Sequence, residues 1–244
     1  MKPPISALLL DLDQTLADNR FSGNQAWEDA YAALIEHDPS LPHGDLKTIY
    51  WRMSNDIWSV VDEKMPQDAS AEAIRLEVWP EALRRVGCKN WERLGVLASE
   101  RYWERRIETY RLYPDALPFL KKAREQVPVI VVTNGTNDIQ EAKIQAVSLR
   151  EHVDEILVAQ AVGVSKPSPR IFQQALDIAG CTPQQAMMVG DNYEKDIVGA
   201  LQCDIRAVWI RRDENGTDPP YPPYPEAVIH DLSPLLSFLP AGIP

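Results

Sequence analysis

Residues 5–16, with the sequence Ile-Ser-Ala-Leu-Leu-Leu-Asp-Leu-Asp-Gln-Thr-Leu, decide the fold that we predict for this chain. The apolar run at residues 5–10 fits a strand that is buried on both faces, as in a parallel sheet. Asp11 and Asp13 follow it directly, and in open α/β sheets ligands bind at the carboxyl ends of the strands. An acidic pair alone would also fit an ordinary turn. The position after a buried strand favours a functional site.

The rest of the chain shows two kinds of sequence pattern. Residues 24–113 have apolar residues at helical spacing throughout, without a strand pattern. Short β-rich runs lie at residues 127–132, 156–159, 186–189, 206–210 and 227–229, and helical patterns lie at about residues 115–125, 138–149, 168–179, 194–201 and 233–239. Alternating strands and helices are typical of βαβ units. We therefore predict an α/β fold with a parallel sheet, interrupted after its first strand by an all-helical insertion.

The composition limits the possible partners. The chain has 244 residues, 45% of them hydrophobic, and its net charge of −11 argues against a nucleic-acid polymer as partner. Any anionic substrate must be attracted by local positive charge. Three cysteines without Cys-x-x-Cys spacing suggest neither disulfides nor a zinc site. No apolar stretch is long enough for a membrane span or a signal-peptide core, so we expect a cytoplasmic protein without a membrane partner. Both a monomer and a homodimer remain open.

Three further motifs occupy positions comparable to that of the acidic pair. Thr133-Asn134-Gly135 follows the second predicted strand, Lys166-Pro167 precedes the helix at residues 168–179, and Gly190-Asp191-Asn192 follows the strand at residues 186–189. Taken singly, these motifs also fit a turn, a surface lysine and a helix cap. With right-handed crossovers, however, all strands of a parallel sheet end at the same edge. We therefore expect the motifs to meet there.

The chemistry of the motifs is complementary. Several carboxylates at one edge would repel each other, and Mg²⁺ is commonly held by one or two carboxylates together with waters and a substrate phosphate. The Thr133 hydroxyl and the backbone N–H groups around Asn134 are donors of the kind that cradle phosphate oxygens. Lys166 adds a positive charge. These residues predict a site for Mg²⁺ and a phosphate group.

The motifs, in this order, resemble those of the haloacid dehalogenase-like hydrolase superfamily over nearly the whole chain. The resemblance implies a Rossmann-like core formed by residues 1–18 and 113–244, and a helical cap of the C1 type at residues 19–112. Within the superfamily, the stretches at residues 131–135 and 162–167 are similar to the branch that contains nucleotide and acylneuraminate phosphatases.

The resemblance also implies roles for the acids. Asp11 would attack phosphorus, and Asp13 would protonate the leaving oxygen and later activate water. Mg²⁺ would contact the Asp11 side chain, the Asp13 backbone carbonyl and Asp191. Thr15 and Asp196 would lie behind these metal ligands and support them.

Thr133, Asn134 and Lys166 are the implied phosphate-binding residues, and Lys166 is also implied to be catalytic. The function that follows is that of a Mg²⁺-dependent phosphatase, which hydrolyses a small phosphorylated metabolite through an aspartyl-phosphate intermediate. A phosphomutase of the same superfamily and a catalytically silent phosphate-sensing or interaction protein remain as alternatives. Dehalogenation is disfavoured because the dehalogenases lack an acid at the position of Asp13.

Several aromatic and basic residues are candidates for contact with the substrate, but the sequence does not decide which of them bind it. Arg20 could reach a substrate or remain solvated. Within the helical insertion, the candidates for a substrate pocket are Trp51, Arg52, Trp58, Arg75 and Trp79. Tryptophans at helical spacing more often form a core than a binding surface. The sequence therefore supports no statement about specificity.

Overall fold

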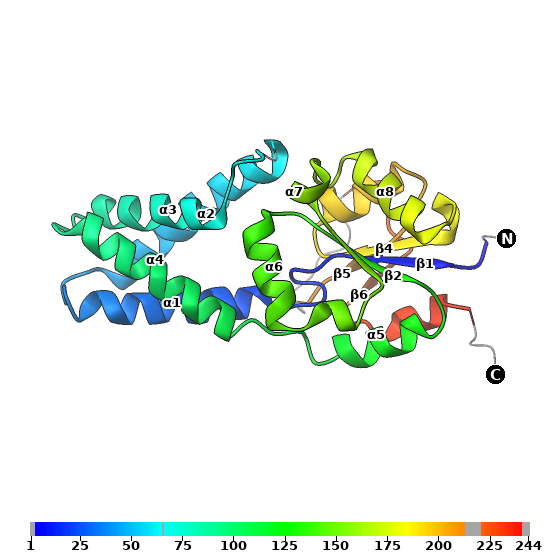
Figure 1. The fold of residues 1–244 in the computed structure, drawn as a ribbon, viewed down its shortest axis with the longest axis horizontal. Coiled ribbons are helices and arrows are strands. Elements are labelled where there is room, and N and C mark those ends of the chain that lie inside the picture. Colours follow the sequence, from blue (N-terminus) through cyan, green and yellow to red (C-terminus); the bar gives the residue numbers. More distant parts are fainter. Residues whose placement is uncertain (1–2, 65, 213–220, 241–244) are drawn as a thin grey trace. The chain divides into compact units, whose positions relative to one another are not determined.

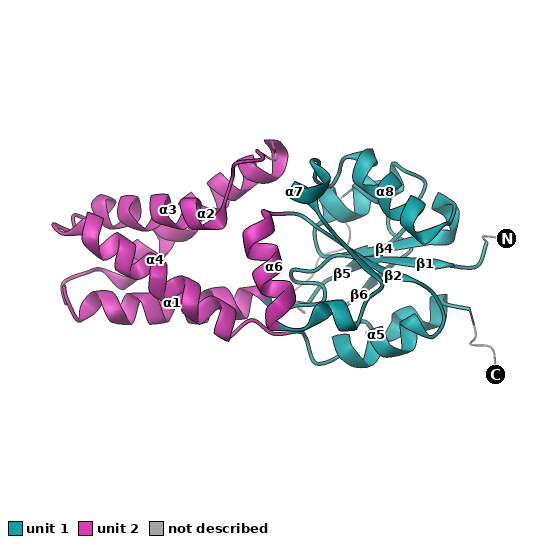
Figure 2. Cartoon of the chain, in the orientation of Figure 1, with its two compact units in different colours: residues 1–18, 112–134, 147–244 teal, residues 19–111, 135–146 magenta. Residues whose placement is uncertain are grey.

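The computed structural model describes residues 3–64, 66–212 and 221–240. The chain forms two compact units, coloured separately in Figure 2. The first, here called the sheet unit, comprises residues 1–18, 112–134 and 147–244. The second, here called the helical unit, comprises residues 19–111 and 135–146.

The sheet unit is built on a parallel sheet, as predicted. Its strands are β1 (Ala7–Leu10), β2 (Val129–Thr133), β3 (Glu155–Val158), β4 (Ala186–Gly190), β5 (Arg206–Ile210) and β6 (Ala227–Ile229). Among the described residues they form one six-stranded sheet in the order β3-β2-β1-β4-β5-β6. All residues of β1 are fully buried, because β2 and β4 flank it and helices cover the sheet. The α/β prediction is confirmed.

Helices pack on both faces of this sheet. Figure 1 shows α8 (Pro169–Ala179) on one face and α5 (Ala116–Arg124) on the other. The Ser168 side chain caps α8 by accepting the Arg170 N–H, and Gly180, in a left-handed conformation, ends the helix. The remaining helical segments are η1 (Leu149–Glu151), α7 (Ala159–Val162), η2 (Pro183–Gln185), η3 (Tyr193–Val198), α9 (Gly199–Leu201) and η4 (Ser233–Phe238).

Two predicted helices of the sheet unit have a different form. The pattern at residues 194–201 corresponds to a π-helix, η3, that runs into the short α9, and the pattern at residues 233–239 corresponds to the 3₁₀ helix η4. Apolar spacing over so few residues does not distinguish these helices from an α-helix. In η3 the Asn192 side chain fixes the first turn by accepting the Lys195 N–H over 3.0 Å.

The helical unit contains α1 (Asn19–Ile35), α2 (His43–Lys64), α3 (Ala71–Arg85), α4 (Trp91–Glu108) and α6 (Asn137–Ala146). Trp27 and Trp79 are fully buried in its core, and Tyr50 packs on Trp79 with ring centroids 4.3 Å apart. Trp79 is therefore a core residue, in line with its helical spacing. None of the helices in the described ranges is long and apolar enough to cross a membrane.

The compact units differ from the predicted domains mainly in residues 135–146. We predicted this segment as part of the Rossmann-like domain, but its helix α6 groups with the other helices of the helical unit. Hydrogen bonds give a physical reason. The Asp138 carboxylate accepts the backbone N–H groups of Ala71 and Glu72, over 2.8 and 3.4 Å, at the start of α3. The acid thereby satisfies two N–H groups that the helix leaves unpaired.

The contact between α3 and α4 depends on a glycine. A Cβ atom on Gly95 of α4 would lie 2.5, 2.6 and 2.7 Å from Cγ, Cα and N of Pro80 in α3. Because two of these atoms are backbone, the helices would have to separate. We expect Gly95→Ala to lower the free energy of unfolding by about 1–3 kcal/mol, measured by urea denaturation.

Gly44→Ala provides the matched control. Nothing lies within 4 Å of a Cβ atom built on Gly44 in α2. Its replacement should leave stability unchanged or raise it by up to about 1 kcal/mol, because alanine favours helix more than glycine does. Equal stability of the two variants would contradict our account of the packing between α3 and α4.

Candidate active site

The register of the sheet aligns the ends of its central strands. Leu10, the last residue of β1, lies opposite Val131 in β2 and Val189 in β4. Thr133 is the last residue of β2, and Asp191 follows β4 directly. As the parallel order requires, residues from distant motifs are therefore found at one edge of the sheet.

Lys166 forms ion pairs with two acids at this edge. Its Nζ lies 2.6 Å from Oδ1 of Asp11 and 2.7 Å from Oδ1 of Asp196. The three residues are 2%, 7% and 1% exposed, respectively. Buried charges are stable only when they are paired, so these contacts hold the three side chains in one arrangement. The structure thus brings together three predicted site residues.

Asn134 fixes the backbone that carries Lys166. Its side chain donates from Nδ2 to the Lys166 carbonyl oxygen over 3.0 Å, and its Oδ1 accepts the Lys166 N–H over 2.9 Å. The amide of Asn134 is thereby used between two loops, so any contribution to phosphate binding is left to its backbone N–H. Thr133, beside it, is buried at the end of β2.

Asp196 is held in place by its own loop. Its Oδ2 accepts the backbone N–H of Asn192 over 3.0 Å. The carboxylate also lies directly against Gly190, where any Cβ atom would collide with it. Gly190 is therefore required for the approach of Asp196 to Lys166.

The electrostatics of the site reflect an excess of acids. Burial, with repulsion from Asp196 and Asp13, raises the pKa of Asp11 to about 7, although Lys166 opposes the shift. Burial and the neighbouring Asp11 raise the pKa of Asp191 to about 8. Burial lowers the pKa of Lys166, but the carboxylates of Asp11 and Asp196 outweigh this effect and hold it above its usual range. One ammonium group does not balance the carboxylates.

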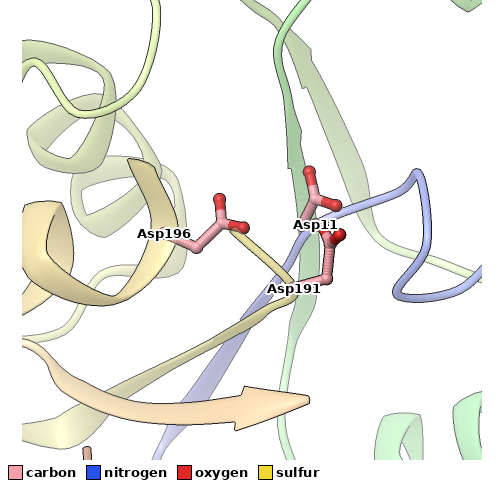
Figure 3. A group of neighbouring side chains, drawn as sticks. All are labelled: Asp11, Asp191 and Asp196. Atoms are coloured by element: carbon pink, nitrogen blue, oxygen red, sulfur yellow. The ribbon is translucent and has the colours of Figure 1, made fainter. Parts of the chain in front are cut away.

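The arrangement of these acids fits a divalent cation. Asp11, Asp191 and Asp196 each present an oxygen atom within 4.8 Å of the others, and Figure 3 shows their side chains converging. An all-oxygen donor set of this kind suits Mg²⁺. A bound cation would also relieve the repulsion that raises the pKa values of Asp11 and Asp191.

Asp13 lies in a tight loop after β1. The Gln14 N–H donates to the Ala17 carbonyl oxygen over 2.7 Å, and Gln14 has a φ of +62°. The Asp13 side chain is partly exposed and close enough to Asp11 to raise the pKa of that carboxyl. Asp13 is thus partly exposed and lies near Asp11.

The side chains of Thr15 and Arg20 make none of the ion pairs or hydrogen bonds described above for Asp11, Lys166, Asn134 and Asp196. The Thr15 hydroxyl is buried and has no hydrogen-bond partner within the described ranges, whereas the Thr15 carbonyl oxygen accepts two bonds from Arg212, of 3.2 and 2.6 Å. Arg212 also donates to both carboxylate oxygens of Asp115. The backbone of Thr15, through its contact with Arg212, therefore helps to fix the loop after β1. The Arg20 side chain is exposed.

The motifs did not reveal two supporting residues. Arg212 fixes the loop after β1, and Trp209 of β5 donates its indole N–H to the backbone oxygen of Asp191 over 2.8 Å. Trp209 is the last residue but one of the predicted strand at residues 206–210, and Arg212 lies two residues beyond that strand, so the rule about strand ends could have drawn attention to both. Neither belongs to a recognisable motif.

The chain is similar in sequence to a known family and to several known proteins. The model of the haloacid dehalogenase-like hydrolases matches residues 5–204. A phosphoserine phosphatase of Thermus thermophilus is 34% identical over 235 residues, covering 87% of this chain and 91% of the relative. An N-acylneuraminate-9-phosphatase of Rattus norvegicus is 28% identical, covering 95% and 94%.

Solved structures share the fold. The HAD-hydrolase YfnB of Bacillus subtilis, determined with bound magnesium, aligns over 98% of this chain and 100% of its own, with a TM-score of 0.74 and 20% identity. A 2-haloacid dehalogenase of Pseudomonas syringae aligns over 96% and 97%, with a TM-score of 0.67 and 27% identity. The match of the family model and the identity to the Thermus relative show that this chain belongs to the haloacid dehalogenase-like hydrolases.

Proposed function

We propose that this chain is a Mg²⁺-dependent phosphatase that hydrolyses a small phosphorylated metabolite through an aspartyl-phosphate intermediate. The observation that carries the proposal is the Lys166 ammonium group between the carboxylates of Asp11 and Asp196. The relatives described as phosphoserine phosphatase and N-acylneuraminate-9-phosphatase support the reaction class. The magnesium in the YfnB structure supports the metal.

The residues that would hold Mg²⁺ are Asp11 and Asp191, through their carboxylates, and Asp13, through its backbone carbonyl. When bound, the ion neutralises negative charge on the phosphoryl oxygens. Lys166 would supply a second positive charge to these oxygens, and Asp196 would position Lys166. Thr133 and the backbone N–H of Asn134 would donate hydrogen bonds to the same group.

Asp11 performs the first half of the reaction. One of its carboxylate oxygens attacks phosphorus and forms an oxygen–phosphorus bond as the bond to the ester oxygen breaks. Asp13 gives its proton to the departing oxygen, so the product leaves as an alcohol. Phosphoryl transfer needs mainly positioning and charge neutralisation, which the fixed Lys166 provides.

Water completes the second half. Asp13, now a carboxylate, takes a proton from the water that attacks phosphorus. The bond between phosphorus and the Asp11 oxygen breaks, which releases inorganic phosphate and restores both acids. The partial exposure of Asp13 leaves it room to contact both the leaving group and the water.

The nucleophile can be tested with Asp11→Asn. An amide is a far weaker nucleophile than a carboxylate, so release of phosphate from p-nitrophenyl phosphate should fall below detection. Asp177→Asn, an exposed acid on α8, should retain wild-type activity. Near wild-type turnover by a folded Asp11→Asn protein would refute the assignment. With hexose phosphates as substrates, an isomerised ester instead of free phosphate from the wild type would favour a mutase.

The role of Lys166 can be tested with Lys166→Met, which keeps much of the side-chain volume. Loss of a charge directed at the transferring phosphoryl group should lower kcat by about a hundredfold or more. The exposed Lys122 on α5 provides a control, Lys122→Met, for a general effect of charge. Unchanged steady-state kinetics in Lys166→Met would remove this residue from the mechanism.

The metal can be tested by removal and by weakening one ligand. Chelation with EDTA should abolish phosphate release, and added Mg²⁺ should restore it. In Asp191→Asn the Mg²⁺ concentration for half-maximal activity should rise by at least about tenfold, because even residues that only orient metal ligands contribute this much. Calorimetric titration with Mg²⁺ alone should show the same weakening. Full activity after exhaustive chelation would overturn the metal requirement.

A further inference from the structure

Aromatic side chains contact the loop that carries Asp191. Trp209 of β5 lies beside Gly190 of β4 in the sheet register, and its indole N–H donates to the Asp191 backbone oxygen over 2.8 Å. The Trp209 ring meets the Tyr193 ring edge-on, with ring centroids 5.0 Å apart. All of these residues belong to the sheet unit. The aromatic contacts therefore reach the backbone of a candidate metal ligand.

Tyr193 is fastened to a proline-rich segment, residues 221–225. The Tyr193 hydroxyl lies 2.6 Å from the carbonyl oxygen of Tyr221 and 3.0 Å from that of Pro223. The rings of Tyr193 and Tyr221 also pack edge-on, with centroids 5.5 Å apart. Three of the five residues in the segment are prolines, which have no N–H. A regular sheet ladder therefore cannot hold the segment, and the Tyr193 hydroxyl binds it instead.

The proline-rich segment is held by the sheet at its other end. It leads into β6, which pairs with β5, and the Glu226 N–H donates to the Ala207 carbonyl oxygen over 2.8 Å. The Glu226 carboxylate also accepts two hydrogen bonds from Arg206, both of 2.9 Å. Tyr193 is therefore bonded to a segment whose own position is fixed.

The contacts of Trp209 and Tyr193 hold the two ends of one short loop. Trp209 binds the backbone of Asp191, and Tyr193 lies two residues further on, at the first position of η3. Asn192, between them, is exposed. Asp196 belongs to the same π-helix as Tyr193. The aromatic contacts thus restrict the position of Asp191 relative to Asp196.

Asp191 needs such a restraint because its carboxylate lies among other acids. Asp11, Asp191 and Asp196 each present an oxygen atom within 4.8 Å of the others. Since like charges repel, a loop that was free to move would carry Asp191 away from the other two acids before a cation binds. A binding-competent arrangement that is only partly populated lowers the apparent affinity for a ligand in proportion. Restraint of the loop backbone therefore favours binding of a cation.

We propose that Trp209 and Tyr193 are positioning residues that hold Asp191 in place for Mg²⁺, and that the proline-rich segment takes part by binding the Tyr193 hydroxyl. The inference rests on the proposed function, because it concerns the same metal site. It adds that the affinity for Mg²⁺ depends on aromatic residues that are not metal ligands. Loss of either hydrogen bond should weaken Mg²⁺ binding although every carboxylate is retained.

Calorimetric titration with Mg²⁺ alone tests the proposal. Trp209→Phe removes the indole N–H and keeps an aromatic ring, and Tyr193→Phe removes only the hydroxyl. In each variant we expect the dissociation constant for Mg²⁺ to rise by about threefold to tenfold, which is the contribution of one hydrogen bond between neutral groups. The double variant should bind Mg²⁺ more weakly than either single variant.

Trp27→Phe and Tyr31→Phe make the same chemical changes in the helical unit. The Trp27 indole nitrogen is buried without a hydrogen-bond partner among the described residues, and the Tyr31 hydroxyl donates to the Leu41 carbonyl oxygen over 2.8 Å. Both variants should keep the wild-type dissociation constant for Mg²⁺, even where thermal unfolding shows a loss of stability. Circular dichroism establishes that each variant is folded. An equal loss of Mg²⁺ affinity in these controls would overturn the proposal.

The indole N–H resonance of Trp209 provides a second measurement. It is assigned in a ¹⁵N-resolved NMR spectrum by its absence from the spectrum of Trp209→Phe. Addition of Mg²⁺ to the wild type should shift this resonance and leave that of Trp27 unchanged. A Trp209 resonance that does not respond to saturating Mg²⁺ would contradict the link between Trp209 and the metal site.

Binding separates failure of this inference from failure of the proposed function. Weaker Mg²⁺ binding in Asp191→Asn, but not in Trp209→Phe and Tyr193→Phe, would overturn the inference and leave the metal site intact. Weaker binding in both aromatic variants would support the inference even if the wild type hydrolysed no phosphate ester. An unchanged dissociation constant in Asp191→Asn would overturn the metal assignment and the inference together.

Discussion

The ion pairs of Lys166 with Asp11 and Asp196 are the constraint on which the rest of the site depends. Each of the three side chains is more than nine-tenths buried, and a buried charge without its partner is destabilising by about 3–5 kcal/mol. They come from the end of β1, the loop before α8 and the helix η3. Charge pairing therefore ties three segments, far apart in the chain, to one arrangement.

Neighbouring residues hold the paired side chains in position. Asn134 joins its loop to the backbone of Lys166 with two hydrogen bonds, and Gly190 leaves the space into which the Asp196 carboxylate fits. The pairing is nevertheless incomplete, because Asp191 adds a further acid, and the pKa values of Asp11 and Asp191 rise to about 7 and about 8. A second lysine could balance this charge, but a divalent cation can bind several carboxylates and a phosphate at once. The acid excess therefore favours a metal site.

Much of the sheet unit could be predicted from the sequence because its geometry follows from backbone rules. The apolar run before Asp11 indicated a buried strand, and the common direction of parallel strands placed Thr133 and Asp191 at the same edge. The bonds of the Asn134 side chain to Lys166 could not be predicted, because they depend on the separation of two loops. The π-helical form of η3 could not be predicted either, because a few apolar positions fit several helix types.

The helical unit could be predicted only as a set of helices. The sheet unit could be predicted in more detail, and this difference between the two units has a physical cause. Trp79 and Arg75 lie on the same helix and were both named as candidates for a pocket. Trp79 is fully buried in the core, whereas two buried nitrogen atoms of Arg75 have no hydrogen-bond partner among the described residues. Helical spacing tells which residues share a face, but the partners of that face come from other helices. Candidate catalytic residues at strand ends can therefore be predicted from motifs. Residues that select a substrate, when they depend on contacts among several helices, have to be identified from the packed structure.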